Sequence, residues 1–316
     1  MRTNNKILAL SLGITVMLTG CNMVPNNTKS TEAKTGTEVH PGENQEIAMN
    51  TENLVSVQDY NGEGYALRDG EETDKIAEAN REDIEVAVKK FFSEKYKTEV
   101  IVHNLVGAVD GVSVFVESLG EPHFHAFAIV PIDVKSKTVN TDGVWSQEGQ
   151  VENALSGGLY AMAYEKEMAT LDSFVNNIAK EYPVVGKTKE AVDKTDSGYS
   201  TPFYYLNFFT DVFGQLNSMY LENQNLSKEQ LRSFLDENKF ETEAVKITIN
   251  LFMKESNVDP DKEIYSKIVS EIEGMEGLPR GAYTLLLHDN LINSKYGSGS
   301  KNNSIEETTI NEIIKE

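Results

Sequence analysis

The strongest hydrophobic pattern in the chain runs from Val100 to Val134. β-branched and aromatic residues dominate this stretch, and turn residues divide it into three runs, which is typical of β-strands. Asp110-Gly111, between the first two runs, is a strong signal for a tight hairpin. Gly120-Glu121-Pro122 predicts a second turn. The pattern therefore predicts an antiparallel β-meander of three strands.

The first turn predicts how the first two strands align. A two-residue turn at Asp110-Gly111 pairs Val109 with Val112 and, counting outward, sets His103 opposite Ser118. Because side chains alternate between the two faces of a sheet, His103 and Ser118 are expected on the same face.

The second turn predicts where two more histidines lie. A four-residue loop sets Ser118 opposite His123. His125 then shares this face with His103, whereas Glu117 points to the other face. A slip of one residue at this turn would move His123 and His125 to the opposite face. Both faces are largely apolar, so we expect helices to cover one face and at least part of the other.

Helical patterns flank the meander. Thr73 is a candidate cap for a helix from Glu72 to Tyr96, directly before the meander. Two helices are expected after it, at Gln147–Glu165 and Glu167–Tyr182. Gly158 in the first of these would permit close packing on the meander. This order predicts an α+β fold with a helix packed on an antiparallel β-meander.

The second half of the chain is expected to be mostly helical. Ser227 opens a helix through a capping box, and Asp259-Pro260 opens another that runs to about Glu273. Ala244–Met253 alternates enough to be a strand, with a helix as the alternative. Gly281–Tyr296 is expected to form a C-terminal hairpin.

These patterns divide the chain into five segments. They are a lipoprotein signal peptide at 1–20, a disordered tether at 21–55, an α+β domain with the central meander at 56–190, a helical or α+β second half at 191–297, and a polar tail at 298–316. The tether is predicted because its polar composition offers few side chains to bury.

The N-terminus carries a targeting signal. A positively charged start precedes a short apolar stretch, Ile7–Leu18, which is too short for a comfortable transmembrane helix. The stretch ends in Leu18-Thr19-Gly20-Cys21, which resembles the bacterial lipobox. The resemblance implies cleavage before Cys21, which receives a diacylglyceryl group and anchors the protein. The alternative is an ordinary secreted protein with an incidental cysteine, but Cys21 is the only cysteine in the chain.

Charge limits the classes of partner. The formal net charge is −21 at pH 7, so nucleic acid is not expected as a partner, because a phosphate backbone needs a basic surface. Contact with the membrane is expected through the N-terminal lipid. With one cysteine, no intramolecular disulfide can form.

The candidate site consists of histidines at one end of the meander. His123 and His125 lie at i and i+2, so both can point at one metal ion, and His103 would join them across the small Ser118. The three histidines are the candidate ligands for Zn²⁺, and Ser118 and Glu121 are candidate binding residues. Alternatively, the histidines are structural and no cofactor is expected. The sequence lacks a phosphate-binding loop, a nucleophile elbow and a zinc-protease helix, so no catalytic residue is assigned.

Three stretches, at 103–118, 120–134 and 158–165, together with the lipobox, resemble a family of uncharacterised lipoproteins of Gram-positive bacteria, known only as a domain of unknown function. The resemblance covers about 57–314. It implies anchoring on the outer side of the cytoplasmic membrane and implies no activity.

Three functions stay open at this point. The leading hypothesis is a non-enzymatic, membrane-anchored lipoprotein that binds a protein or small ligand at the cell surface. The alternative is a metal-dependent envelope hydrolase that uses His103, His123 and His125. A third is a stress-related or immunity-type protein that blocks an enzyme with its meander. The sequence favours a non-enzyme without deciding the question.

Overall fold

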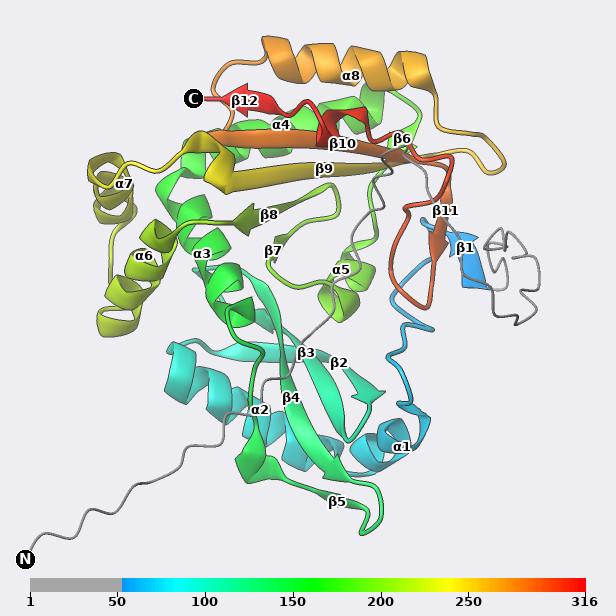
Figure 1. The fold of residues 1–316 in the computed structure, drawn as a ribbon, viewed down its shortest axis with the longest axis vertical. Helices are drawn as coiled ribbons and strands as arrows, with labels where there is room; N and C mark the ends of the chain where they lie inside the picture. Colours follow the sequence, from blue (N-terminus) through cyan, green and yellow to red (C-terminus); the bar gives the residue numbers. More distant parts are fainter. Residues whose placement is uncertain (1–52) are drawn as a thin grey trace, which may run out of the picture. The chain divides into compact units, whose positions relative to one another are not determined.

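A four-stranded antiparallel sheet and the two helices before it form the first part of the folded chain (Figure 1). The computed structural model describes residues 53–316, so the predicted signal peptide, Cys21 and most of the predicted tether lie outside the described residues. The described residues belong to one compact unit, Met49–Glu316. Its helices are α1 (Glu71–Ala79), α2 (Arg81–Tyr96), α3 (Gln150–Ala163), α4 (Glu165–Glu181), α5 (Lys189–Thr195), α6 (Asp211–Glu222), α7 (Lys228–Glu237) and α8 (Lys262–Gly274).

The strands form two main sheets and one short pair. The first sheet has the order β2-β3-β4-β5, and the second has the order β12-β10-β9-β8-β7, with β6 also paired to β9. The short pair is β1 with β11. The strands are β1 (Leu54–Ser56), β2 (Val100–Ala108), β3 (Gly111–Ser118), β4 (His125–Asp133), β5 (Thr138–Val139), β6 (Val184–Val185), β7 (Tyr199–Ser200), β8 (Tyr204–Phe208), β9 (Val245–Met253), β10 (Gly281–His288), β11 (Leu291–Asn293) and β12 (Ile313–Lys315).

The predicted meander and the α+β class are confirmed. α1 and α2 pack on one face of the meander and join its apolar side chains in the core. The expected single helix over Glu72–Tyr96 is instead two helices, because the Asn80 side chain donates to the carbonyl of Ile76 and so competes with the helical pattern. Thr73 does not cap the helix. Its hydroxyl lies in the first turn and is within hydrogen-bond distance of the carbonyl of Ala108, on β2.

The register between β2 and β3 differs from the prediction. Ala108 pairs with Gly111, so Val109 and Asp110 form the turn. Asp110 adopts the left-handed conformation, with φ at 55°. A side chain at Gly111 would come within 3.1 Å of the carbonyl oxygen of Val130 on β4. The glycine therefore favours the close approach of β4, and the turn lies one residue earlier than predicted.

A bulge and a longer second loop change which side chains share a face. The β2–β3 register shifts at His103, and Glu117 pairs directly with His125. The predicted alignment of Ser118 with His123 is therefore wrong by one residue, the slip that exchanges the faces of a strand. Glu117 lies on the same face as His125, and Ser118 points to the opposite face.

The second half is helical, as expected, and also contains the larger sheet. The predicted strand at Ala244–Met253 corresponds to β9, which pairs antiparallel with β8 and parallel with β10. α8 connects β9 to β10, as a parallel pair requires a crossover. The capping box at Ser227 is present with both of its hydrogen bonds at the start of α7. α8 is capped by Asp261, two residues after the predicted Asp259.

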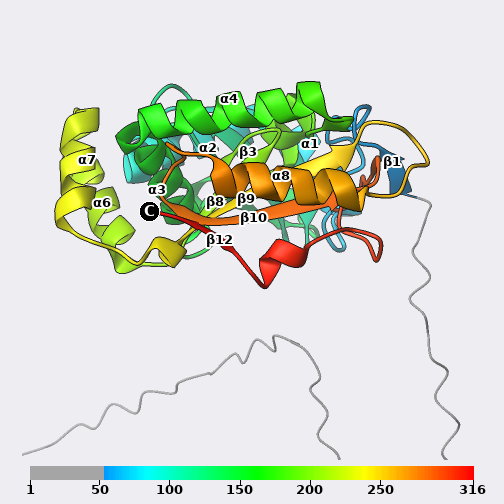
Figure 2. The same ribbon diagram turned by 90° about the horizontal axis from the view of Figure 1, so that it is seen from above.

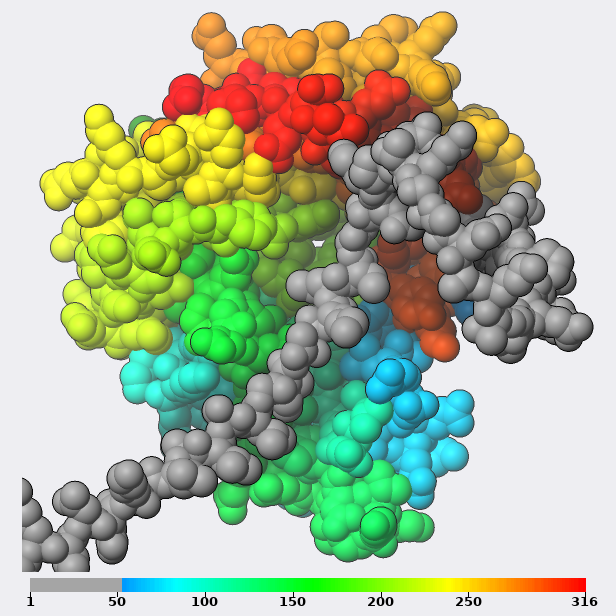
Figure 3. Space-filling view, viewed as in Figure 1, coloured from blue at the N-terminus to red at the C-terminus, as the bar shows by residue number. Residues whose placement is uncertain are grey.

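The expected C-terminal hairpin does not form. β10 and β11 follow one another across Asp289-Asn290, but β10 pairs with β9 and β12, and β11 pairs with β1. A local alternation of side chains identifies a strand but does not identify its partner. The polar tail predicted at 298–316 contains a strand, because β12 pairs antiparallel with β10 at the edge of the second sheet (Figure 3).

Helix α5 connects the two sheets. It contacts β2 and β3 of the meander, and its Ala191 packs with Phe252 of β9. α4 and α8 lie along the same side of the second sheet (Figure 2), and one hydrophobic core contains buried residues of both sheets. No helix within residues 53–316 combines the length and the apolar character needed to cross a membrane.

Candidate functional site

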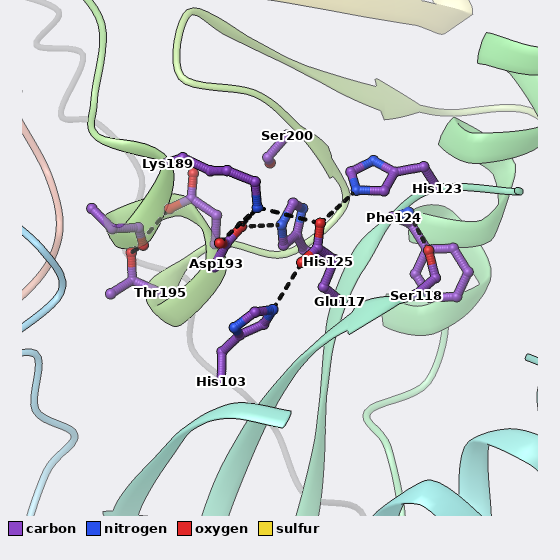
Figure 4. A network of polar contacts seen from close by, with 12 residues as sticks. His103, Glu117, Ser118, His123, Phe124, His125, Lys189, Asp193, Thr195 and Ser200 are labelled. Atoms are coloured by element: carbon purple, nitrogen blue, oxygen red, sulfur yellow. Dashed lines mark hydrogen bonds and ion pairs between the residues drawn. The ribbon is translucent and has the colours of Figure 1, made fainter. Parts of the chain in front are cut away.

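Glu117 is the centre of a polar cluster between the meander and α5 (Figure 4). Its Oε2 accepts a hydrogen bond from Nε2 of His103 at 2.8 Å, and its Oε1 accepts one from Nε2 of His123 at 2.9 Å. The bulge at His103 re-aims that side chain, as bulges commonly do. One carboxylate therefore holds two of the predicted histidines.

Helix α5 supplies the other charged groups. Oδ1 of Asp193 accepts a hydrogen bond from Nε2 of His125 at 3.0 Å. Nζ of Lys189 lies 2.7 Å from both oxygens of Asp193 and 3.4 Å from Oε1 of Glu117. Thr188 caps the helix and so fixes where it begins. We call the six residues the Glu117 cluster: His103, Glu117, His123, His125, Lys189 and Asp193.

Hydrogen bonds determine the charge of Glu117. Burial alone would raise the pKa of its carboxyl, but hydrogen bonds from His123 and His103, with the charge of Lys189, lower that pKa to about 2. The carboxylate is therefore ionised at neutral pH. Burial opposes the charge of Lys189, but its hydrogen bond to Asp193 and the charges of both carboxylates raise its pKa. The centre of the cluster is an ion pair between carboxylates and one ammonium group.

His125 is neutral and has one free nitrogen. Its side chain is 2% exposed, and burial lowers its pKa although the hydrogen bond to Asp193 opposes this effect. Because Nε2 donates its proton to a carboxylate, the neutral ring carries a lone pair on Nδ1. Among residues 53–316, Nδ1 has no hydrogen-bond partner. A buried polar atom without a partner is uncommon in proteins.

The structure brings the three predicted histidines together, but neither predicted binding residue joins them. Ser118 is buried on the opposite face, where its hydroxyl donates to the carbonyl of Pro122 and accepts from the N–H of Phe124. Glu121 lies on the loop between β3 and β4 and pairs with Lys228 at 2.9 Å. Both side chains thus hold the loop that carries His123.

Sequence analysis missed Glu117, Lys189 and Asp193. The predicted register assigns Glu117 to the wrong face. Asp193 lies 68 positions after its partner His125, and no local pattern joins residues so far apart. The spacing of Lys189 and Asp193 on one helical face was visible, but such pairs are common on exposed helices.

Two overlapping sets of side chains in the cluster have the donors and the spacing for a metal ion. One set is Glu117, His123 and His125, and the other is His103, Glu117 and Asp193. In each set, one ligand atom of every residue lies within 4.8 Å of the others. Imidazole nitrogen and carboxylate oxygen are the donors that Zn²⁺ commonly takes from proteins.

A pocket of about 240 Å³ adjoins the cluster at His123, whose side chain is 40% exposed. The His123 ring packs edge-on against Tyr199, with ring centroids 6.2 Å apart. A side chain at Gly158 would come within 2.7 Å of the His123 carbonyl oxygen, so this glycine lets α3 approach the loop. The pocket is small, which suits a small polar group rather than a large ligand.

The fold is similar to that of a solved protein. It matches the crystal structure of a DUF1672 family protein from Staphylococcus aureus subsp. aureus Mu50 with a TM-score of 0.67 and 19% sequence identity. The match covers 84% of this chain and 98% of the other. At this identity the likeness shows the fold alone. Among curated proteins, no relative is found.

The sequence itself matches a family model. The model, described as a protein of unknown function (DUF1672), matches residues 47–315. That range contains both sheets and the whole Glu117 cluster, and it confirms the resemblance to an uncharacterised family of Gram-positive bacteria. The chain belongs to the DUF1672 family.

Proposed function

We propose that this protein is a lipoprotein anchored to the outer face of the cytoplasmic membrane, and that its folded part binds a ligand or protein at the cell surface. The anchor is supported by Leu18-Thr19-Gly20-Cys21, which follows the apolar stretch Ile7–Leu18 as a lipobox does. Cys21 supplies the thiol for a diacylglyceryl group. Such a chain binds a bilayer through its buried methylene groups, at about 0.8 kcal/mol each.

The observation that supports binding is the Glu117 cluster. Its charged groups converge beside a pocket, with His123 and Lys189 partly open to solvent. Glu117, with a pKa of about 2, is a weak proton acceptor at neutral pH, because general bases work best with a pKa near the working pH. Fixed charges and charge-assisted hydrogen bonds serve recognition better than proton transfer.

Replacement of the lipobox cysteine tests the anchor. In a Gram-positive host, Cys21→Ala should move the protein from the membrane fraction to the soluble or secreted fraction. The matched control is Thr19→Ala, which keeps a small residue in the motif and should stay in the membrane fraction. A Cys21→Ala protein that remains membrane-bound in high salt would contradict the anchor.

A screen of melting temperature tests the binding function. Small anions, amines and divalent cations are added to the wild type and to Glu117→Gln, since a ligand that binds the folded state raises its stability. A ligand that stabilises only the wild type supports the cluster as the binding site. If every stabilising ligand acts equally on both proteins, binding occurs elsewhere.

A metal-dependent envelope hydrolase is the second candidate, and one observation favours it. His125 donates one ring N–H to Asp193 and keeps the other nitrogen free, which is the usual arrangement of a metal-bound histidine. This candidate requires ester or phosphodiester hydrolysis that depends on added Zn²⁺ and is lost in His125→Ala. Zinc-loaded protein without turnover on such substrates would exclude it.

A further inference from the structure

Glu117, His123 and His125 present their donor atoms at a spacing close to that around a metal ion. Nε2 of His123 lies 2.9 Å from Oε1 of Glu117, and one ligand atom of each of the three lies within 4.8 Å of the other two. Around a tetrahedral Zn²⁺ with bonds of about 2.0–2.1 Å, neighbouring ligand atoms are about 3.3 Å apart. Small shifts of these side chains would therefore surround one ion. Nε2 of His123 would then bind through its lone pair, so the proton that it donates to Oε1 must move to Nδ1 or to solvent.

Asp193 prepares His125 for this role. The Asp193 carboxylate accepts the Nε2 proton of His125 at 3.0 Å, so the ring is held in the tautomer whose Nδ1 lone pair is free. That nitrogen is buried and has no hydrogen-bond partner among residues 53–316. A carboxylate behind a metal-binding histidine fixes the ring and makes it a stronger donor. Binding of an ion through this nitrogen would leave the bond to Asp193 intact.

His103 orients the carboxylate from the other side. It donates to Oε2 of Glu117 at 2.8 Å, while Oε1 faces His123. With Oε2 held in this way, Oε1 remains the oxygen available to an ion. The second set of potential ligands, which contains His103 and Asp193, would instead take away the hydrogen bond with which His103 orients Glu117.

The ammonium group of Lys189 already lies beside the carboxylates of Glu117 and Asp193. This group lies 3.4 Å from Oε1 of Glu117 and 2.7 Å from Asp193, and the Lys189 side chain is 66% exposed. An exposed lysine can turn out into solvent at little energetic cost, because exposed ion pairs contribute only about 0.2–1 kcal/mol. The carboxylates therefore hold a displaceable cation rather than a buried one.

We propose that Glu117, His123 and His125 bind one divalent transition-metal ion of the Zn²⁺ class, with Asp193 and His103 as positioning residues and Lys189 displaced by the ion. The inference rests on the proposed binding function, because it names the ligand of the same cluster. Two imidazoles and one carboxylate favour Zn²⁺ over Ca²⁺ or Mg²⁺, which prefer oxygen ligands. His123 also lines the pocket of about 240 Å³, which therefore lies beside the proposed site.

A zinc titration tests the ligand set. The untagged chain beginning at Asn22, which contains the whole compact unit from Met49, is stripped with a chelator and titrated with Zn²⁺ in a calorimeter. We expect one ion per chain with a dissociation constant of about 10 µM or below. His123→Ala and Glu117→Gln should each weaken binding by at least about 100-fold, more than the 10–100-fold expected for loss of an orienting partner.

Three further variants separate the roles of the other residues. Asp193→Asn should weaken binding by about 10–100-fold as a positioning residue. Lys189→Met should tighten binding by about threefold, because it removes a competing charge from an exposed pair. Glu78→Gln is the matched control, since its carboxylate pairs with Arg81 at 2.7 Å on the helices that cover the other face of the meander, and its loss should leave zinc affinity unchanged.

The same zinc titrations can refute the proposed site. Absence of saturable zinc binding refutes it, as does binding that Glu117→Gln and His123→Ala leave unchanged. If His103→Ala abolishes binding while His123→Ala does not, the ligand set is wrong. Circular dichroism shows whether each variant folds, and His123→Ala keeps the test valid if Glu117→Gln does not fold. A negative zinc result leaves the anchor and the ligand screen untouched, so the two proposals can fail separately.

Discussion

Protonation of His288 should weaken the folded state as the pH falls. The His288 side chain lies in β10, is 1% exposed and packs on Phe252. Its Nε2 bonds to Oδ1 of Asn250 at 2.8 Å, and its Nδ1 bonds to the Ser304 hydroxyl at 2.7 Å. The neutral ring satisfies both bonds. Burial, with a further effect of the Lys301 charge, lowers the pKa of His288 to about 4.

The sign and size of the effect follow from linkage between protonation and folding. In the unfolded chain the pKa of a histidine is about 6.5, so the unfolded chain takes up this proton before the folded chain does. The contribution of His288 to stability is therefore complete above pH 6.5 and is lost as the pH falls toward 4. For a folded pKa of about 4, the loss is about 2 kcal/mol at pH 5 and approaches about 3 kcal/mol at pH 4.

Urea unfolding of the wild type and of His288→Gln measures this loss. Free energies of unfolding are compared at pH 7.5 and pH 5.0. The variant should lose about 2 kcal/mol less than the wild type between these two values. Comparing the change with pH removes the cost of the altered packing. The control is Phe252→Leu, which disturbs the same packing and keeps the titrating ring, so it should retain the wild-type change with pH.

Two results would refute the reasoning about His288. The first is a His288→Gln variant with the full pH dependence of the wild type. The second is a nuclear magnetic resonance titration in which the His288 ring of the folded protein takes up its proton above pH 6. Either would mean that the ring is hydrated or relaxes on protonation, and that its burial does not oppose the charge.

Two substitutions near the loop between β3 and β4 give further predictions. Gly158→Ala would bring a methyl group within 2.7 Å of the His123 carbonyl oxygen and should cost about 1–3 kcal/mol in urea unfolding. Gly214→Ala, with no atom within 4 Å of the new carbon, should instead stabilise α6 by about 0.5–1 kcal/mol; equal effects of the two would contradict the packing argument. Ser118→Ala removes the partner of the buried Phe124 N–H and should also cost about 1–3 kcal/mol, and an unchanged melting curve would show that this N–H finds another partner.

The fold class and the meander were predictable because they depend on local patterns. Alternating apolar residues identify β2, β3 and β4, and the capping box at Ser227 identifies the start of α7. The exact alignment was not predictable, because Asp110 adopts the left-handed conformation in the turn, whereas Gly111, the residue type that favours it, lies in the strand. The bulge at His103 is likewise set by packing between strands rather than by a local sequence signal.

The candidate site was predictable only in part. The spacing of His123 and His125 correctly indicates that the two rings lie near each other, with centroids 5.3 Å apart. Which β3 side chain lies between these two histidines and His103 depends on the register of the strands. An error of one residue in the register puts Ser118 there instead of Glu117. Asp193 comes from a helix far along the chain, so its role depends on how α5 packs, which no local pattern states.

The pairing of β1 with β11 has a consequence for the order in which the chain folds. Leu54 pairs with Asn293, whereas the meander joins strands that follow one another directly. During synthesis from the N-terminus, the meander can close soon after it emerges, because contacts between near neighbours in sequence form fastest. Leu54 cannot pair until Asn293 has been synthesised, near the end of the chain. Among the strands of residues 53–316, β1 is therefore made first but is among the last to pair.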